Sequence, residues 1–227
     1  MLYKTRGVIL SYIKFRETSI IVKIYTEEFG LQTYIENGVR STKSKGKIAL
    51  FQPLTLVEMV VYFKQGVEIQ RISEIKCSTP FFSIPTDIKK SVLGIFVTEI
   101  LSLTLKEHTE NNALFGFLTD ALLFLENHDE QIENFHLFFM MGLSGFLGFG
   151  PETARDVKRQ MIENGIVITT DEELILKKVL ETPFGGNLNI GKNQRMRTLD
   201  ILIDFYRINL DSFTGVKSLS VLKEVLE

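Results

Sequence analysis

The chain has 227 residues, of which 44% are hydrophobic and 24% are charged, and its formal net charge is -2. This composition supports a hydrophobic core and excludes an intrinsically disordered protein. The single cysteine, Cys77, excludes a disulfide framework within the chain and a zinc site built from cysteines.

Residues 1–80 have the pattern of β-strands. β-branched and aromatic residues alternate with polar ones over short runs, which glycines and charged residues separate. This pattern occurs in five segments, namely 8–15, 18–26, 31–37, 54–64 and 67–76. Five antiparallel strands in about eighty residues have the size of an OB-fold or of another small barrel. The strand count does not choose between them.

Residues 81–227 change to the period of amphipathic helices. We predict helices over 88–103, 112–125, 130–147, 152–164, 172–181, 194–210 and 216–227. Glu99 is unusual because it lies on or near the apolar stripe of the first of these helices. Ile166, Val167 and Ile168 indicate a short strand, inside an irregular segment near 165–192. The sequence therefore predicts an α+β protein with a barrel domain over 1–80 and an all-α domain over 81–227.

Charge is unevenly distributed between these two domains. Residues 1–80 hold twelve Lys and Arg against seven Asp and Glu, a net charge of +5, whereas the remainder holds 14 against 21, a net charge of -7. A basic first domain beside an acidic second one is typical of a protein whose first domain meets a polyanion. Chance alone also produces asymmetries of a few charges.

No residue constellation indicates an enzyme, a metal site or a cofactor. The three histidines lie in different segments without the spacing of metal ligands. Residues 38–47 lack the glycine and hydroxyl positions of a P-loop, and Gly142 to Gly145 lacks the lysines of a phosphate clamp. The first residues lack the pattern of a secretion signal, and the longest apolar stretch is too short to cross a bilayer. We therefore expect a soluble, cytoplasmic, non-enzymatic protein without catalytic residues.

The strongest positive signal is the basic segment 40–47, RSTKSKGK. It holds four cations within eight residues, and no acidic residue occurs from 37 to 57. Such a loop can contact phosphates and release their counterions. Two more pairs of cations lie at strand spacing i, i+2 and extend this surface. The candidate DNA-binding residues are Lys4, Arg6, Lys14, Arg16, Arg40, Lys43, Lys45 and Lys47.

Aromatic residues of the same domain admit two interpretations. Tyr12, Phe15, Tyr25 and Tyr34 supply rings on which bases of a single strand could stack. The same residues are equally typical of a barrel core, and the lysines of a solvated strand edge. For each single aromatic residue, the core interpretation is favoured.

Several segments together resemble the RecO family of DNA repair proteins. In the first domain these are residues 4–10 (KTRGVIL), 17–19 (ETS), 25–30 (YTEEFG), 38–41 (GVRS) and 52–54 (QPL). Near the end of the chain they are 205–206 (FY), Phe213 and 216–222 (VKSLSVL). The resemblance spans nearly the whole chain in the same order. It implies an N-terminal five-stranded OB-fold followed by helices.

The resemblance also implies a function and partners. RecO relatives act as recombination mediators: they bind single- and double-stranded DNA, anneal complementary strands and help to load recombinase onto strands coated by single-strand-binding protein. RecR and the acidic, hydrophobic C-terminal tail of single-strand-binding protein are the implied protein partners, and the cytoplasm, at the nucleoid during repair, is the implied location. Candidate cations beside a pocket for that tail are Arg195, Arg197, Arg207 and Lys217, although solvated helix faces explain each of them equally well.

One feature departs from the family pattern. Many RecO relatives hold a zinc ion in a four-cysteine module, and residues 147–151 (LGFGP) match the approach to it. Residues 151–192 contain no cysteine, so we expect packing instead of metal to stabilise this segment. Two functions remain open: a mediator that acts through its basic barrel, or an adaptor whose helical domain binds repair partners while the barrel contacts DNA only incidentally.

Overall fold

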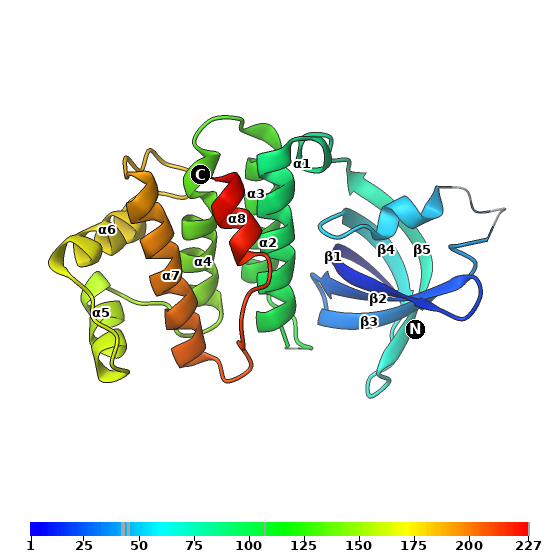
Figure 1. Cartoon of the computed structure of the whole chain (residues 1–227). Helices are drawn as coiled ribbons and strands as arrows, with labels where there is room; N and C mark the ends of the chain where they lie inside the picture. The colour runs from blue at the N-terminus through cyan, green and yellow to red at the C-terminus, as the bar shows by residue number, and fades with distance from the viewer. Residues whose placement is uncertain (42–43, 45, 107, 227) are drawn as a thin grey trace. The chain divides into compact units, whose positions relative to one another are not determined.

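The computed structural model describes residues 1–41, 44, 46–106 and 108–226. The chain divides into two compact units, one formed by residues 1–82 and 105–122 and the other by 83–104 and 123–227 (Figure 1). The first unit contains the strands and the second contains most of the helices.

The first unit is built on a closed barrel in the strand order β1-β2-β3-β5-β4. Its strands are β1 (Leu2–Phe15), β2 (Ser19–Thr26), β3 (Gly30–Glu36), β4 (Leu56–Tyr62) and β5 (Ile69–Thr79). This architecture confirms the predicted OB-fold, with one difference: β3 and β5 pair in parallel, at Thr33–Ile35 against Ile69–Arg71. A closed ring with an odd number of strands cannot alternate direction throughout, so one neighbouring pair must be parallel.

The barrel core forms from alternate residues of every strand. The 3-10 helix η1 (Lys47–Phe51) adds Phe51, which is fully buried against this core. Tyr25 and Tyr34 are 3% and 0% exposed, so the core interpretation holds for both. These two rings are therefore not available to stack on bases.

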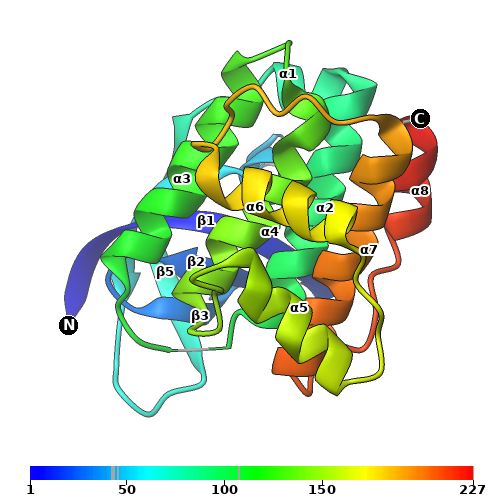
Figure 2. The same cartoon turned by 90° about the vertical axis from the view of Figure 1, so that its left-hand side faces the viewer.

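The second unit is a helical bundle around one apolar helix. Its elements are α1 (Ser83–Thr86), α2 (Ile88–Thr104), the end of α3 (Asn112–Asn127), η2 (Ile132–Asn134), α4 (Phe135–Phe146), α5 (Ala154–Glu163), α6 (Thr170–Glu181), α7 (Lys192–Asn209) and α8 (Leu219–Val225). Helix α4 is packed against α2, α6 and α7 (Figure 2). Helices α2 to α8 correspond to the seven helices that the sequence predicts.

The predicted strand at Ile166 to Ile168 is wrong. These residues form neither strand nor helix, and connect α5 to the first residue of α6. The Ile166 amide donates to the Met161 carbonyl at 2.8 Å, which closes the end of α5. β-branched residues form a strand only where a neighbouring strand completes the hydrogen bonds, and among the described residues of this unit there is none.

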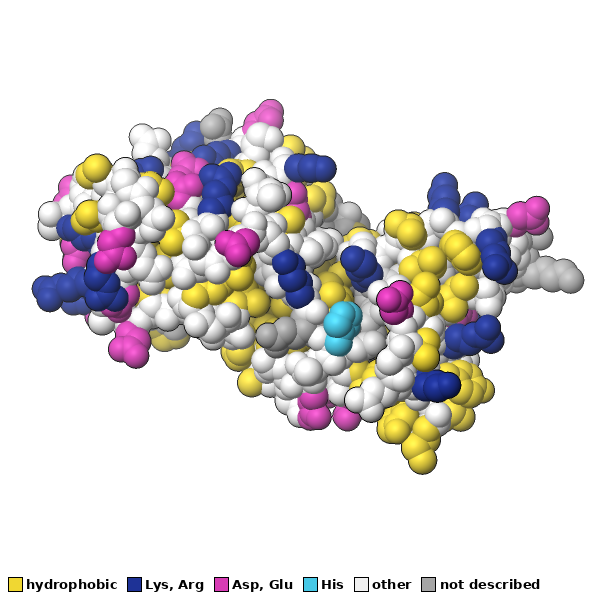
Figure 3. Space-filling model, turned by 90° about the horizontal axis from the view of Figure 1, so that it is seen from below, with side chains coloured by type: hydrophobic (Ala, Val, Ile, Leu, Met, Phe, Trp, Pro, Cys, Tyr) yellow, Lys and Arg dark blue, Asp and Glu magenta, His cyan; other side chains and the backbone are white. Residues whose placement is uncertain are grey.

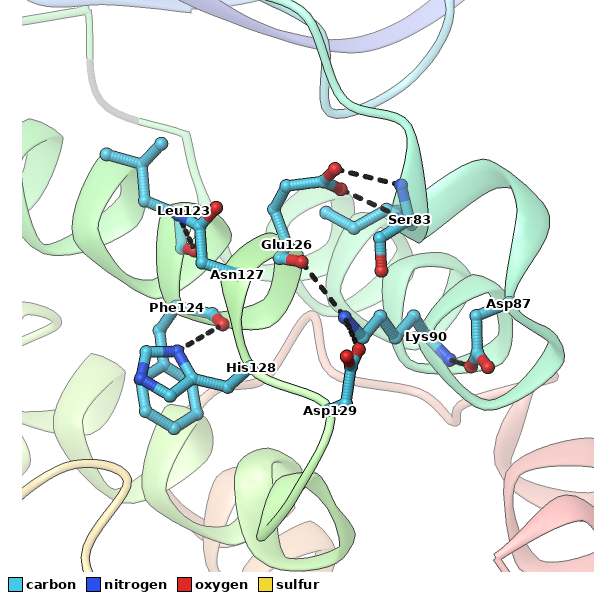
Figure 4. A network of polar contacts seen from close by, with 10 residues as sticks. Ser83, Asp87, Lys90, Leu123, Phe124, Glu126, Asn127, His128 and Asp129 are labelled. Carbon is cyan, nitrogen blue, oxygen red and sulfur yellow. Dashed lines mark hydrogen bonds and ion pairs between the residues drawn. The ribbon is translucent and has the colours of Figure 1, made fainter.

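A network of polar groups ties the beginning of this unit to the end of α3 (Figure 4). The Glu126 carboxylate accepts hydrogen bonds from the amides of Ser83 and Ile84 at 2.8 and 2.9 Å. The Lys90 side chain is 1% exposed, and its ammonium donates to the Glu126 carbonyl at 2.9 Å and to Asp129 at 2.8 Å. A cation thus lies at the C-terminus of α3, where the helix dipole favours positive charge.

Glu99, which is unusual on an apolar stripe, holds α8 in place. Its carboxylate accepts hydrogen bonds from the Lys217 amide at 2.7 Å, the Ser218 amide at 2.8 Å and the Ser218 hydroxyl at 2.6 Å. Ser218 is the residue before α8, so the negative charge lies at the N-terminus of that helix. Burial acts to raise the pKa of Glu99, but the hydrogen bonds from Ser218 and Lys217 outweigh it, and the pKa is lowered.

We expect Glu99→Ala to lower the free energy of unfolding by about 1–3 kcal/mol, because three donors lose a charged acceptor. Urea unfolding measures this loss, and hydrogen exchange of the α8 amides locates it. Lys89→Ala, an exposed change on the same helix, is the control and should leave stability within about 0.5 kcal/mol. Equal stability of the two variants would contradict the role of Glu99 in holding α8.

Candidate nucleic-acid interface

Two arginines that are distant in sequence meet at one end of the barrel. The Arg40 amide donates to the Thr18 carbonyl at 2.9 Å, and its guanidinium donates to the Arg16 carbonyl at 3.2 Å. Arg16 follows β1 with φ of 50°, in the left-handed region, and its guanidinium lies over the Phe15 ring at 5.1 Å. The turn after β1 and the segment after β3 therefore bring the Arg40 side chain against the Arg16 backbone.

Both guanidinium groups are exposed and available to an anion. Among the described residues, no carboxylate forms an ion pair with Arg16 or Arg40. Lys14, two residues before Arg16 and at the end of the same strand, is also exposed. We call Lys14, Arg16 and Arg40 the basic end of the barrel. An unneutralised set of cations at one place is the arrangement that binds phosphates of a nucleic-acid backbone.

Lys47 differs from these three residues because its charge is already neutralised. Its ammonium lies 2.5 Å from the Glu36 carboxylate, whose side chain is only 12% exposed. Lys43 and Lys45, the other cations predicted for this loop, lie outside the described residues. The described part of the predicted basic loop thus presents Arg40 to solvent and holds Lys47 in an ion pair.

Lys4 and Arg6 belong to a different surface of the same unit. They lie on β1 about ten residues before the basic end, which is up to about 33 Å along an extended strand. Together with residues of β4, β5 and the turn after β2 they line a groove of about 510 Å³. Its charged lining residues are Lys4, Arg6, Lys76, Glu27, Glu28, Glu58 and Glu74.

This groove is less suited to phosphate than the basic end. Arg6 forms a two-point ion pair with Glu27, with Nε and Nη2 donating at 2.8 and 2.5 Å. This pair raises the pKa of Arg6 and lowers that of Glu27. The Phe115 ring lies 5.2 Å from the same guanidinium. Four carboxylates against three cations disfavour a polyanion in this groove. The described cations of the prediction thus belong to separate places, with Lys4 and Arg6 at the groove.

The surface of the barrel also exposes residues that the sequence did not indicate. In the face shown by Figure 3, Lys and Arg side chains dominate the charged atoms of the barrel at the right, with hydrophobic side chains between them. Tyr62 is 51% exposed, and the strand register places it opposite Arg71. In β4, Val61 lies inside the barrel and Tyr62 lies outside it. This alternation with a period of two could have predicted the exposed ring from the sequence.

Three of the four cations predicted for the helical unit already have side-chain partners. Arg195 donates to Asn134 at 2.9 Å and is partly buried, and this burial lowers its pKa. Arg197 pairs with Glu172 at 2.6 Å, and Arg207 pairs with Asp204 at 2.8 Å. Lys217 contributes its amide to Glu99. Arg195 and Arg197 are two positions apart on one helix, about 200° around its axis, so they face different directions.

The segment 151–192 does not fit a zinc ion. It has no thiolate, and several of its carboxylates already have partners. Asp156 accepts from Thr153 at the start of α5, Glu172 accepts from Thr169 at the start of α6, and Glu173 pairs with Lys158 at 2.8 Å. Across the described residues, no group of three or more His, Cys, Asp or Glu is arranged to hold a metal ion. Packing of the buried apolar side chains of α5 and α6, together with helix caps and ion pairs, stabilises this segment.

Every helix in the described part of the chain is too short or too polar to span a membrane.

Two protein-family models match the chain. The model described as "Recombination protein O N terminal" matches residues 1–81, and the model described as "Recombination protein O C terminal" matches residues 85–219. The first match covers the barrel strands, and the second covers the helices from α2 to α7.

Relatives match over the full length of the chain. Proteins named "DNA repair protein RecO" from Flavobacterium psychrophilum and Flavobacterium johnsoniae are 39% and 36% identical, with 99% of each chain covered. The protein of that name from Bacteroides fragilis is 35% identical with 100% of both chains covered. The two family models, the full-length relatives and the barrel followed by helices lead to one conclusion: this chain belongs to the RecO family of DNA repair and recombination proteins.

Proposed function

We propose that this chain is a non-enzymatic recombination mediator. It binds single- and double-stranded DNA through its barrel, anneals complementary strands and helps to load recombinase onto strands coated by single-strand-binding protein, with RecR as a partner. The observation that supports this most directly is the basic end, where Lys14, Arg16 and Arg40 are exposed and no described carboxylate neutralises the two arginines.

The mechanism follows from electrostatics. Two DNA strands repel each other through their phosphates, and cations that neutralise part of this charge lower the cost of bringing the strands together. The guanidinium groups of Arg16 and Arg40 donate to phosphate oxygens, which positions the backbone without reading the bases. Base pairing between the two strands then supplies the sequence specificity. The protein needs no catalytic group for this reaction.

We expect the purified protein to accelerate annealing of two complementary oligonucleotides, with an effect that falls as salt increases from about 50 to about 200 mM. Fluorescence quenching between end-labelled strands measures the rate. The basic-end variant Arg16→Glu/Arg40→Glu should lose most of the acceleration. No acceleration by the wild-type protein at low salt would contradict the mediator function.

A second candidate is an adaptor whose helical unit binds protein partners. The observation that favours it is a set of exposed apolar side chains in the segment that lacks zinc: Ile162, Val167 and Leu174 are 55%, 76% and 53% exposed. Exposed apolar residues of this kind are found where proteins bind each other. The adaptor predicts that RecR or the tail of single-strand-binding protein is retained equally by the wild type and by Arg16→Glu/Arg40→Glu. Loss of both partners in that variant would exclude it.

A further inference from the structure

The segment between β3 and η1 is closed at its base by one ion pair. Glu36 is the last residue of β3 and Lys47 is the first residue of η1, and their charged groups lie 2.5 Å apart. The chain reverses at both ends of the segment, at Gly38 and Gly46, with φ of 71° and 88°. Ion pair and reversals together bring the two ends of a ten-residue connection to the same place.

The same base is joined to the turn that follows β1. The Ser19 hydroxyl donates to the Asn37 side chain at 2.8 Å, and the Arg40 amide donates to the Thr18 carbonyl at 2.9 Å. Arg40 lies four residues after Glu36, so the conformation at this base determines where its guanidinium projects. The Glu36 side chain is 12% exposed and that of Lys47 is 36% exposed, so salt screens this ion pair less than it screens a fully exposed one.

We propose that Glu36 and Lys47 are positioning residues: their ion pair holds Arg40 beside Arg16, and the Lys47 ammonium does not itself contact DNA. This inference rests on the proposed DNA binding and deepens it, because it gives different roles to the two described cations of the basic segment: Arg40 meets phosphate and Lys47 closes the loop. A Lys47 that bound phosphate would have to leave Glu36 and abandon a partly buried carboxylate, which is costly.

A length-compensation series tests the proposal without changing net charge. Glu36→Asp shortens the acidic side chain by one methylene and weakens the ion pair. Lys47→Arg in the same chain lengthens the basic side chain and restores the ion pair. We expect Glu36→Asp to weaken binding of a single-stranded oligonucleotide about two- to fivefold, the range of a partly exposed ion pair. The double variant Glu36→Asp/Lys47→Arg should recover the wild-type affinity. Glu17→Asp, in the turn next to Arg16 and exposed, is the matched control and should have no effect.

Hydrogen exchange of the Arg40 amide gives a readout that needs no DNA. This amide is bonded to the Thr18 carbonyl, so exchange should accelerate in Glu36→Asp and return to the wild-type rate in the double variant. Unchanged exchange in Glu36→Asp would overturn the positioning role, whether or not the protein binds DNA. A wild type that does not bind DNA would instead contradict the proposed function, and the exchange rates would still decide whether the pair positions Arg40.

One further comparison addresses direct contact by Lys47. If Lys47 only positions Arg40, Lys47→Met should cost less affinity in a chain that already contains Glu36→Asp than in the wild type, because the pair is already weakened there. An equal loss in the wild-type and Glu36→Asp backgrounds would show that the ammonium acts without Glu36, and would overturn the proposal.

Discussion

Reversal of both charges at the basic end, in Arg16→Glu/Arg40→Glu, should weaken binding of single-stranded DNA about 100-fold at low salt. Each phosphate contact that is lost makes the plot of log affinity against log salt shallower by about 0.7 on a single strand, so the loss of two contacts should reduce its slope by about 1.4. Fluorescence anisotropy of a labelled oligonucleotide, titrated at several salt concentrations, measures both quantities. The loss should be independent of base sequence, because the contacts are to the backbone.

The control for this change is Lys177→Glu/Lys178→Glu. Both lysines are exposed on α6, and their reversal alters net charge by the same amount in the other unit of the chain. We expect binding to fall only slightly in this variant, through the long-range field. Equal losses in the two double variants would show that net charge, and not the basic end, determines affinity.

Acid should destabilise the protein through His136. This side chain on α4 is fully buried, and neither ring nitrogen has a hydrogen-bond partner among the described residues. Burial, and secondarily the positive charge of Arg195, lowers its pKa from 6.5 to about 3. The folded protein therefore excludes a proton that the unfolded chain binds below pH 6.5. Stability from the neutral imidazole is fully present above pH 6.5 and is lost as the pH falls toward 3.

His136→Met removes this proton-binding group while it keeps an apolar side chain of similar volume. The free energy of unfolding of the wild type should fall relative to this variant by about 1.4 kcal/mol per pH unit, or roughly 2–3 kcal/mol between pH 6.5 and 4.5. Urea unfolding at a series of pH values measures the difference. His128→Gln, which changes an exposed histidine, should follow the wild-type profile. Parallel profiles of wild type and His136→Met would mean that the folded protein accepts the proton at this site.

Much of the fold was predictable because its signals are local. Alternation with a period of two located the five strands, although β1 begins six residues before its predicted start, and a period near 3.6 located α2 to α8 within about five residues. The strand predicted at Ile166 to Ile168 failed for the converse reason. Its β-branched residues satisfy the local preference, but a strand also needs a neighbour, and local sequence does not show whether one is present.

The candidate site was predictable only in its composition. The sequence located an excess of cations in the first domain, and the family resemblance connected them with DNA. It did not show that Glu27 neutralises Arg6 or that Glu36 neutralises Lys47. Nor did it show that Arg40 would meet Arg16, 24 positions earlier in the chain. The same holds for Glu99, whose partners Lys217 and Ser218 are more than one hundred positions away.

The sequence by itself thus determined the two kinds of domain, the order of their elements, the absence of cysteine ligands for zinc and the family to which the chain is similar. Only the tertiary structure decided which of the described cations pair with a carboxylate. The physical reason is that hydrophobic periodicity acts between residues that are close in the chain, whereas an ion pair requires two charged groups within about 4 Å of each other. Only strand register and the path of the loops determine which distant groups come that close.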